Sequence, residues 1–222
     1  MLFRLLLVFN FVLKFLSKSV LLSLSFLHFV AWSSPVFAEN AKIMVYGDSL
    51  SAAYGIPQQQ GWASLLQKKL DAERYQYKVV NASISGETTS GGVSRIQQTL
   101  TQTKPNIIIL ELGANDGLRG LPIQDMTANL NTIIEQSKKS GAKILLVGMR
   151  IPPNYGPQYT KRFSQSYVKL SQEHNVPLVP FMLENVAAKA NLIQDDGLHP
   201  NAIAQPLVLD NIWPHLKQLL KK

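Results

Sequence analysis

Four short polar segments contain residue types suited to nucleophilic catalysis. Three of them directly follow apolar, strand-like runs and the fourth precedes the last helical stretch; they cover residues 47–51, 81–88, 113–117 and 195–201. In sheets of parallel strands, ligands bind beyond the carboxyl ends of the strands. We therefore expect the four segments to meet at one edge of a sheet.

Ser49 is the candidate nucleophile. It follows a strand-like run at the expected start of a helical turn, which exposes a hydroxyl and directs backbone N–H groups toward it. A lone serine at such a position is more often a helix cap, because a hydroxyl is a weak nucleophile without a base. His199 is the best base, since it lies in a Gly/Pro-rich loop. His174 lies near the end of a predicted polar helix and His215 lies in the last predicted helix, and both are interpreted as surface residues.

Asp196 lies three residues before His199 and can orient its imidazole. A carboxylate that accepts a hydrogen bond from one ring nitrogen fixes the tautomer, so that the other nitrogen faces Ser49. Asp195 is the rival for this role, and its alternative interpretation is a turn or cap residue. We favour a catalytic triad of Ser49, His199 and Asp196.

The oxyanion that forms during attack on a carbonyl needs hydrogen-bond donors. The candidates are the backbone N–H groups of Ser49 and Gly86 and the side-chain amide of Asn115. Taken singly, Gly86 and Asn115 are typical turn residues. As a set at matching strand ends, the three are typical of an oxyanion hole.

Substrate contacts are expected from residues beside these groups. Asp48 directly precedes the nucleophile. Apolar side chains in the neighbouring loops indicate a hydrophobic acyl group, although each could equally serve ordinary loop packing: Leu118, Leu121, Ile151, Tyr155 and Leu198.

The elements that must position these residues follow from the apolar pattern. Strands are predicted over 42–46, 77–80, 106–112, 143–147 and 177–180. Helices are predicted over 62–72, 92–101, 123–140, 158–173, 183–190 and 202–220. Strands that alternate with helices predict a three-layer α/β domain with a parallel sheet and right-handed crossovers. The run 106–112 is apolar on both faces, which suits the centre of that sheet.

Residues 1–38 are predicted to be a signal peptide. They contain three basic residues and no acidic residue, and they close on Val36 and Ala38, which fit the positions that signal peptidase recognises. Cleavage after Ala38 would leave residues 39–222 as a single hydrolase domain, exported to the periplasm or secreted. An uncleaved membrane anchor is the alternative, but the uncharged block after Lys18 is short for a span of ~20 residues.

Charge and cysteine content exclude several classes of function. The formal net charge is +8, of which residues 1–38 supply +3, leaving +5 for the remainder. No run of five or more basic residues exists, so nucleic-acid binding is not expected and membrane contact is at most peripheral. The chain has no cysteine, which excludes disulfides, thiolate catalysis and Cys-ligated metals. We expect a monomer that needs no metal and no organic cofactor.

With these residues in place, the sequence resembles the GDSL or SGNH hydrolase family. Its four motif blocks contribute Ser, Gly, Asn and His in that order, and they match Ser49 in GDSLS, Gly86 in ISGET, Asn115 in GANDG and His199 in DGLHP. The resemblance covers essentially all of the chain after residue 38. It implies a flavodoxin-like fold with strand order 2-1-3-4-5, and the same triad and oxyanion hole.

Within the family, the resemblance is to bacterial periplasmic thioesterases that are also described as arylesterases and lysophospholipases. The strings NASISGET, LGANDGLRGL and DDGLHPNAIAQP support it. It implies an acyl ester, thioester or lysophospholipid substrate, with an acyl pocket lined by loops 116–122 and 151–159. Ala114 and Glu87 depart from that pattern, where Gly and Asp are usual, and the Ala114 methyl group could narrow the pocket edge.

Two other functions stay open. One is a carbohydrate deacetylase on the same scaffold, which would prefer acetyl groups on glycans. The other is a non-catalytic flavodoxin-like binding module. No phosphate-cradling glycine-rich loop supports such a module, and it would leave His199 and Asn115 without a role.

Overall fold

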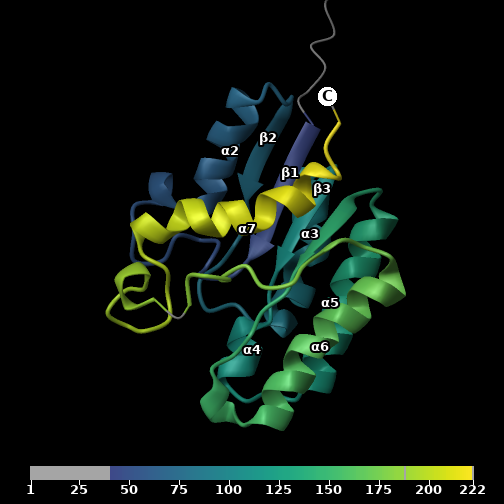
Figure 1. Ribbon diagram of the computed structural model, residues 1–222. Coiled ribbons are helices and arrows are strands. Elements are labelled where there is room, and N and C mark those ends of the chain that lie inside the picture. The colour runs from purple at the N-terminus through teal and green to yellow at the C-terminus, as the bar shows by residue number, and fades with distance from the viewer. Residues whose placement is uncertain (1–40, 188, 222) are drawn as a thin grey trace, which may run out of the picture. The chain divides into compact units, whose positions relative to one another are not determined.

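The computed structural model describes residues 41–187 and 189–221 (Figure 1). The predicted signal peptide, residues 1–38, and its cleavage site lie outside the described residues. Within the described part of the chain, no helix has the length and apolar character needed to cross a membrane.

Five parallel strands form one sheet in the order β2-β1-β3-β4-β5, which confirms the predicted topology. Their bounds are Ala41–Gly47 (β1), Tyr77–Asn81 (β2), Ile107–Glu111 (β3), Lys143–Val147 (β4) and Leu178–Val179 (β5). All five residues of β3 are buried, as expected for a central strand with helices on both faces. The apolar runs therefore form the buried strands of the sheet, and the polar loops follow the carboxyl ends of these strands.

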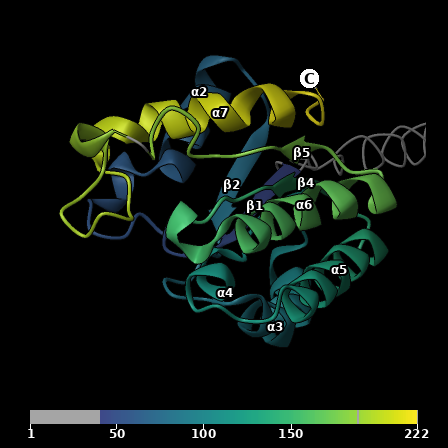
Figure 2. The same cartoon turned by 60° about the horizontal axis from the view of Figure 1, so that its bottom comes forward.

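Helices cover both faces of the sheet. Figure 2 shows α2 (Trp62–Ala72) and α7 (Gln205–Lys217) on one side, and α3 (Thr89–Thr103), α5 (Ile123–Lys139) and α6 (Pro157–His174) on the other. Each helix buries the apolar side chains along one of its faces against the sheet. In α5 the buried positions recur at helical spacing: Met126, Leu130, Ile133, Ile134 and Ser137. The predicted three-layer α/β architecture is confirmed.

Two local predictions were wrong. The described residues of the predicted helix over 183–190 do not form it. Residues 183–187 are a series of turns in which Asn185 has a left-handed backbone with φ of 60°, and Ala190 begins a short 3₁₀ helix, Ala190–Leu192. The last helix begins at Gln205 rather than at residue 202. The Asn201 side chain accepts hydrogen bonds from the backbone N–H groups of Ile203 and Ala204, which holds the preceding turn as a short 3₁₀ helix.

Candidate active site

The nucleophile turn begins where β1 ends. Gly47 lies opposite Glu111 of β3, and a Cβ atom at Gly47 would lie 2.5 Å from Glu111 Oε2 and 2.8 Å from the Glu111 carbonyl oxygen. Only a glycine therefore lets the two strand ends approach this closely. Directly beyond it, the Ala52 N–H donates to the Asp48 carbonyl oxygen (2.9 Å), which turns the chain sharply and presents Ser49 at the sheet edge.

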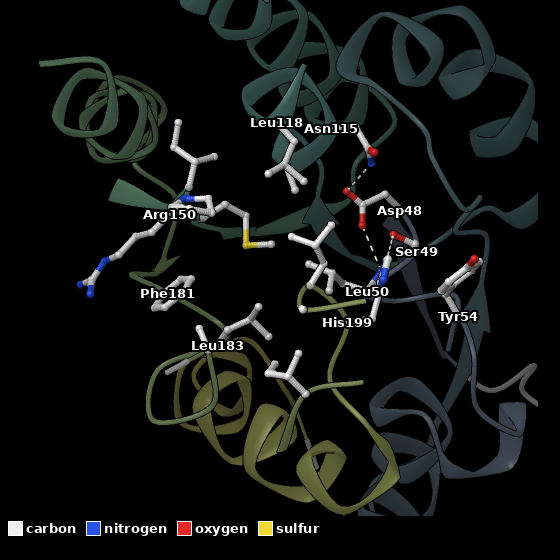
Figure 3. Close-up of a pocket in the computed structure, with 18 of the residues that line it drawn as sticks. Asp48, Ser49, Leu50, Tyr54, Asn115, Leu118, Arg150, Phe181, Leu183 and His199 are labelled. Atoms are coloured by element: carbon white, nitrogen blue, oxygen red, sulfur yellow. Dashed lines mark hydrogen bonds between the residues drawn. The ribbon is translucent and has the colours of Figure 1, made fainter. Parts of the chain in front are cut away.

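Ser49, His199 and Asp196 form a continuous hydrogen-bonded chain, and Figure 3 shows its step from Ser49 to His199. His199 Nε2 lies 2.8 Å from Ser49 Oγ, and His199 Nδ1 lies 2.6 Å from Asp196 Oδ2. The other carboxylate oxygen of Asp196 accepts from the backbone N–H groups of Leu198 (2.9 Å) and His199 (3.0 Å). Asp196 thus shapes the loop and orients the imidazole at the same time.

The electrostatics of Asp196 suit an ionised partner for the imidazole. Burial acts to raise the pKa of Asp196, but the hydrogen bonds from His199 and Leu198 and the charge of His199 outweigh it, and the pKa falls to about 2. A carboxylate that is ionised at all but very acidic pH can stabilise an imidazolium next to it. The rival Asp195 is exposed, and its side chain makes no hydrogen bond to His199 within the described residues.

Gln194 connects the loop that carries Asp196 and His199 to the segment that follows Ser49. Its backbone N–H donates to the His199 carbonyl oxygen (2.8 Å). Its side-chain Nε2 donates to the carbonyl oxygens of Tyr54 (2.8 Å) and Pro200 (3.1 Å). The loop that carries the base is therefore fixed to the segment that follows Ser49.

The predicted oxyanion donors lie at the ends of the next two strands. Asn115 lies in the first turn of the short helix α4 (Ala114–Leu118), which was not predicted and which follows Gly113 with φ of 115°. Asn115 Nδ2 donates to Asp48 Oδ2 (3.1 Å) and to the Glu87 carbonyl oxygen (3.0 Å). Gly86, after β2, has φ of 79°.

These donors border the same cavity as the nucleophile. Ser49, Gly86 and Asn115 all line it, so the structure brings the three together. Arg119 Nη2 also donates to the Gly86 carbonyl oxygen (3.0 Å), which holds the glycine loop against the end of α4. Both loops are thus braced around the space in front of Ser49.

A pair of buried carboxyl groups, Asp48 and Glu111, lies beside the nucleophile turn, and only Asp48 is predicted from the sequence. Asp48, predicted to contact substrate, lines the cavity but is fully buried, and its Oδ1 accepts from the Leu50 N–H (3.0 Å). Glu111 Oε2 accepts from Ser51 Oγ (2.6 Å) and from the Asp48 N–H (3.3 Å). The signal for Glu111 was an acidic residue at the end of an otherwise apolar strand.

Burial sets the protonation of both groups. It raises the pKa of Asp48 to about 7. Burial, reinforced by the nearby Asp48 charge, raises the pKa of Glu111 well above its usual range. Burial therefore favours the protonated, neutral form of Glu111, which holds the nucleophile turn by accepting two hydrogen bonds. Over residues 41–187 and 189–221, no three His, Asp or Glu side chains gather in a way that could hold a metal ion.

The cavity in front of Ser49 has a volume of about 700 Å³ and a largely apolar wall (Figure 3). Of the predicted acyl contacts, three line it: Leu118, Ile151 and Leu198. Three further apolar lining residues, which follow β4 and β5, were not predicted: Met149, Phe181 and Leu183. Their positions just beyond the ends of predicted strands could have identified them as cavity residues.

Tyr155 and Leu121 do not line this cavity, and their contact with substrate stays a prediction. The Tyr155 hydroxyl instead donates to the Leu118 carbonyl oxygen (2.7 Å). Tyr155 thus braces the loop that carries a lining residue. The arrangement as a whole pairs an activated hydroxyl with an apolar chamber, which suits acyl transfer from a hydrophobic acyl group.

Comparison with known proteins agrees with this chemistry. Residues 45–205 match the GDSL-like Lipase/Acylhydrolase family. Esterase TesA of Pseudomonas aeruginosa is 47% identical over 178 residues, which cover 80% of this chain and 89% of that protein. The Escherichia coli (strain K12) protein named thioesterase 1/protease 1/lysophospholipase L1 is 42% identical over 178 residues, which cover 80% of this chain and 84% of that protein.

A solved structure with substantial identity has the same fold. The crystal structure of the psychrotrophic esterase EstA from Pseudoalteromonas sp., inhibited by monoethylphosphonate, is similar with a TM-score of 0.77 and 45% identity. The similarity covers 80% of this chain and 97% of that chain. The sequence match, the fold and the order of the four motif blocks lead to one assignment. The chain belongs to the GDSL-like lipase/acylhydrolase family.

Proposed function

We propose that this enzyme, a serine hydrolase of carboxylic esters and thioesters, works through an acyl-enzyme intermediate on Ser49. The observation that carries the proposal is the contact chain Ser49–His199–Asp196, with steps of 2.8 Å and 2.6 Å, at the edge of an apolar cavity. A hydroxyl hydrogen-bonded to an imidazole that a carboxylate orients is an activated nucleophile.

In the first half of the reaction, Ser49 Oγ attacks the acyl carbonyl carbon and His199 Nε2 takes the hydroxyl proton. Asp196 accepts from His199 Nδ1–H and stabilises the imidazolium. The carbon–oxygen or carbon–sulfur bond to the leaving group then breaks, and the imidazolium gives its proton to the departing alcohol or thiol. A water molecule repeats these steps on the acyl-serine and releases the carboxylic acid.

The negative charge that develops on the carbonyl oxygen is stabilised by the N–H groups of Ser49 and Gly86 and by the Asn115 amide. The Asn115 amide donates to Asp48 and to the Glu87 carbonyl oxygen in the free site. A substrate oxygen must therefore compete for one of these hydrogens. Asp48 thus positions the Asn115 amide.

The apolar wall of the cavity favours a hydrophobic acyl group over the acetyl group of a glycan. The names of relatives, an esterase and a thioesterase/lysophospholipase, support ester, thioester and lysophospholipid substrates for this chain as well. An acyl-length series of p-nitrophenyl esters, compared with acetylated sugars, tests this choice. Turnover confined to acetylated sugars would favour the deacetylase.

The domain boundary and the location of the enzyme are also proposals. The basic, apolar character of residues 1–38 and the Val36/Ala38 pair support export, with cleavage after Ala38. N-terminal sequencing of the protein recovered from the periplasm or medium tests this. A start at Glu39 is expected, and retention of residue 1 in a membrane fraction would favour an anchor.

Replacement of the nucleophile tests the mechanism. Ser49→Ala should lower p-nitrophenyl butyrate turnover by about 10⁵–10⁶-fold, because the covalent route is lost. Ser94→Ala, at an exposed serine on α3, serves as the matched control and should keep full activity. A fluorophosphonate probe should label the wild type and the control but not Ser49→Ala. Retained turnover by a folded Ser49→Ala protein would refute the mechanism, and absence of labelling in the wild type would favour a non-catalytic binding module.

A further inference from the structure

An exposed tyrosine lies directly against the catalytic imidazole. The rings of Tyr54 and His199 have centroids 4.6 Å apart and planes inclined at 40°. Tyr54 is 51% exposed, although it is a large aromatic residue. Figure 3 shows it beside Ser49 and His199, on the far side of them from the apolar lining residues Phe181 and Leu183. The ring therefore lines the cavity at its Ser49–His199 end, where it contacts the base.

The backbone holds this ring in place from both sides. Ala53, the preceding residue, has a left-handed backbone with φ of 60°, which is uncommon for a residue with a side chain. The Tyr54 N–H donates to the Ser49 carbonyl oxygen (3.2 Å), and the Tyr54 carbonyl oxygen accepts from Gln194 Nε2 (2.8 Å). Tyr54 is thus fixed between the segment that carries the nucleophile and the loop that carries the base.

The contact between Tyr54 and His199 involves the aromatic ring of Tyr54 and not its hydroxyl group. Within the described part of the chain, Tyr54 Oη takes part in no hydrogen bond, whereas the ring contacts the imidazole. The aromatic face is therefore the functional feature, and a phenylalanine would present the same face.

A neighbouring aromatic ring can add to the stabilisation of the His199 imidazolium, because the Asp196 carboxylate that pairs with it is partly exposed to water. The side chain of Asp196 is 37% exposed, while that of His199 is 18% exposed. Water weakens the attraction between the carboxylate and the imidazolium that forms during catalysis. A cation within about 6 Å of an aromatic ring centroid is attracted by the electron-rich face of the ring. Tyr54 meets this distance for His199.

We propose that Tyr54 is a positioning residue for His199, whose ring keeps the imidazole plane between Ser49 and Asp196 and stabilises the imidazolium by a cation–π contact. The inference rests on the proposed function, since it assigns His199 as the base. Tyr54 acts through the imidazole, so its removal lowers the rate of the chemical step and leaves substrate affinity nearly unchanged.

Three variants test this inference through steady-state kinetics with p-nitrophenyl butyrate. Tyr54→Phe should keep kcat within about twofold of the wild type, because the ring remains. Tyr54→Leu should lose about 3- to 30-fold in kcat, the range that a cation–π contact accounts for, with little change in KM. Ile203→Ala, which truncates an apolar side chain that is 75% exposed and does not line the cavity, should match the wild type.

A spectroscopic readout separates ring stacking from simple packing. In the wild type and Tyr54→Phe, the ring current should shift the His199 ring-proton resonances upfield, and the shift should vanish in Tyr54→Leu. Tyr54→Met gives a second non-aromatic variant, should the leucine variant fold poorly. The inference is overturned by an unchanged kcat in folded Tyr54→Leu, by equal losses in the Phe and Leu variants, or by a loss confined to KM.

Ser49→Ala is assayed alongside these variants to keep the two proposals apart. An active Ser49→Ala protein would overturn the proposed function itself. An inactive Ser49→Ala protein together with a fully active Tyr54→Leu protein would overturn only the role of Tyr54.

Discussion

Replacement of Glu111 by glutamine tests the proposal that this buried carboxyl group is neutral. The side chain is fully buried, and one of its oxygens accepts hydrogen bonds from Ser51 Oγ and the Asp48 N–H. Glutamine has nearly the same shape and keeps an acceptor oxygen for both donors. The substitution therefore removes the ability to ionise while it leaves the hydrogen bonds of the nucleophile turn in place.

The expected size of the effect follows from proton linkage. In the unfolded chain Glu111 ionises near its ordinary pKa of 4.5, whereas in the folded protein burial raises its pKa well above that value. Above about pH 4.5 the folded state binds a proton that the unfolded state has released, so the stability of the wild type falls as pH rises. The slope is about 1.4 kcal/mol per pH unit until the folded pKa is reached. From pH 4.5 to 6.5, Glu111→Gln should therefore gain stability relative to the wild type, by up to about 2 kcal/mol.

Urea unfolding at about pH 4.5, 5.5 and 6.5 measures this difference. Tryptophan fluorescence is a suitable signal because Trp62 is fully buried. Glu173→Gln, at an exposed glutamate of α6, is the matched control and should show no pH-dependent gain. A stability difference between Glu111→Gln and the wild type that stays constant with pH would refute the neutral assignment, because it would mean that Glu111 ionises alike in the folded and unfolded states.

Three further substitutions address the site. Asp196→Asn should lower kcat for p-nitrophenyl butyrate by about 10³–10⁴-fold, because an amide favours the wrong imidazole tautomer; Asp195→Asn should stay active, and the reverse order would reassign the carboxylate. Asn115→Ala should lower kcat by about 10²–10³-fold through loss of one oxyanion donor, and an unchanged kcat would remove it from that role. Gly113→Ala should lower the free energy of unfolding by about 1–3 kcal/mol in urea titration, since a Cβ there would clash with the Tyr167 hydroxyl at a positive φ, and unchanged stability would contradict the described turn.

Much of the scaffold could be predicted because its signals are local. Each strand is a short apolar run, and amphipathic spacing marks each long helix. The residues of the contact chain, Ser49, Asp196 and His199, were identifiable because a hydroxyl, a carboxylate and an imidazole in loops at predicted strand ends suggest one chemistry. The strand order followed from the family resemblance rather than from the run lengths.

Other features depend on packing that no short segment determines. The turns over 183–187 include the left-handed backbone of Asn185, in a segment whose composition also suits a helix. Burial of Glu111 depends on the approach of Gly47 across the sheet. Tyr155 does not line the cavity, and its hydroxyl instead donates to the Leu118 carbonyl oxygen. The contact between Tyr54 and His199 joins segments far apart in the sequence, so neither segment alone indicates it.

The hydrogen bond between Ser49 and His199 also has a consequence for when the enzyme becomes active. The two residues are 150 positions apart, and the base lies just before the final helix. A chain still emerging from the ribosome therefore has a serine without its base. Hydrolysis begins only after the carboxyl-terminal segment has docked, so the appearance of esterase activity during refolding reports completion of the native fold.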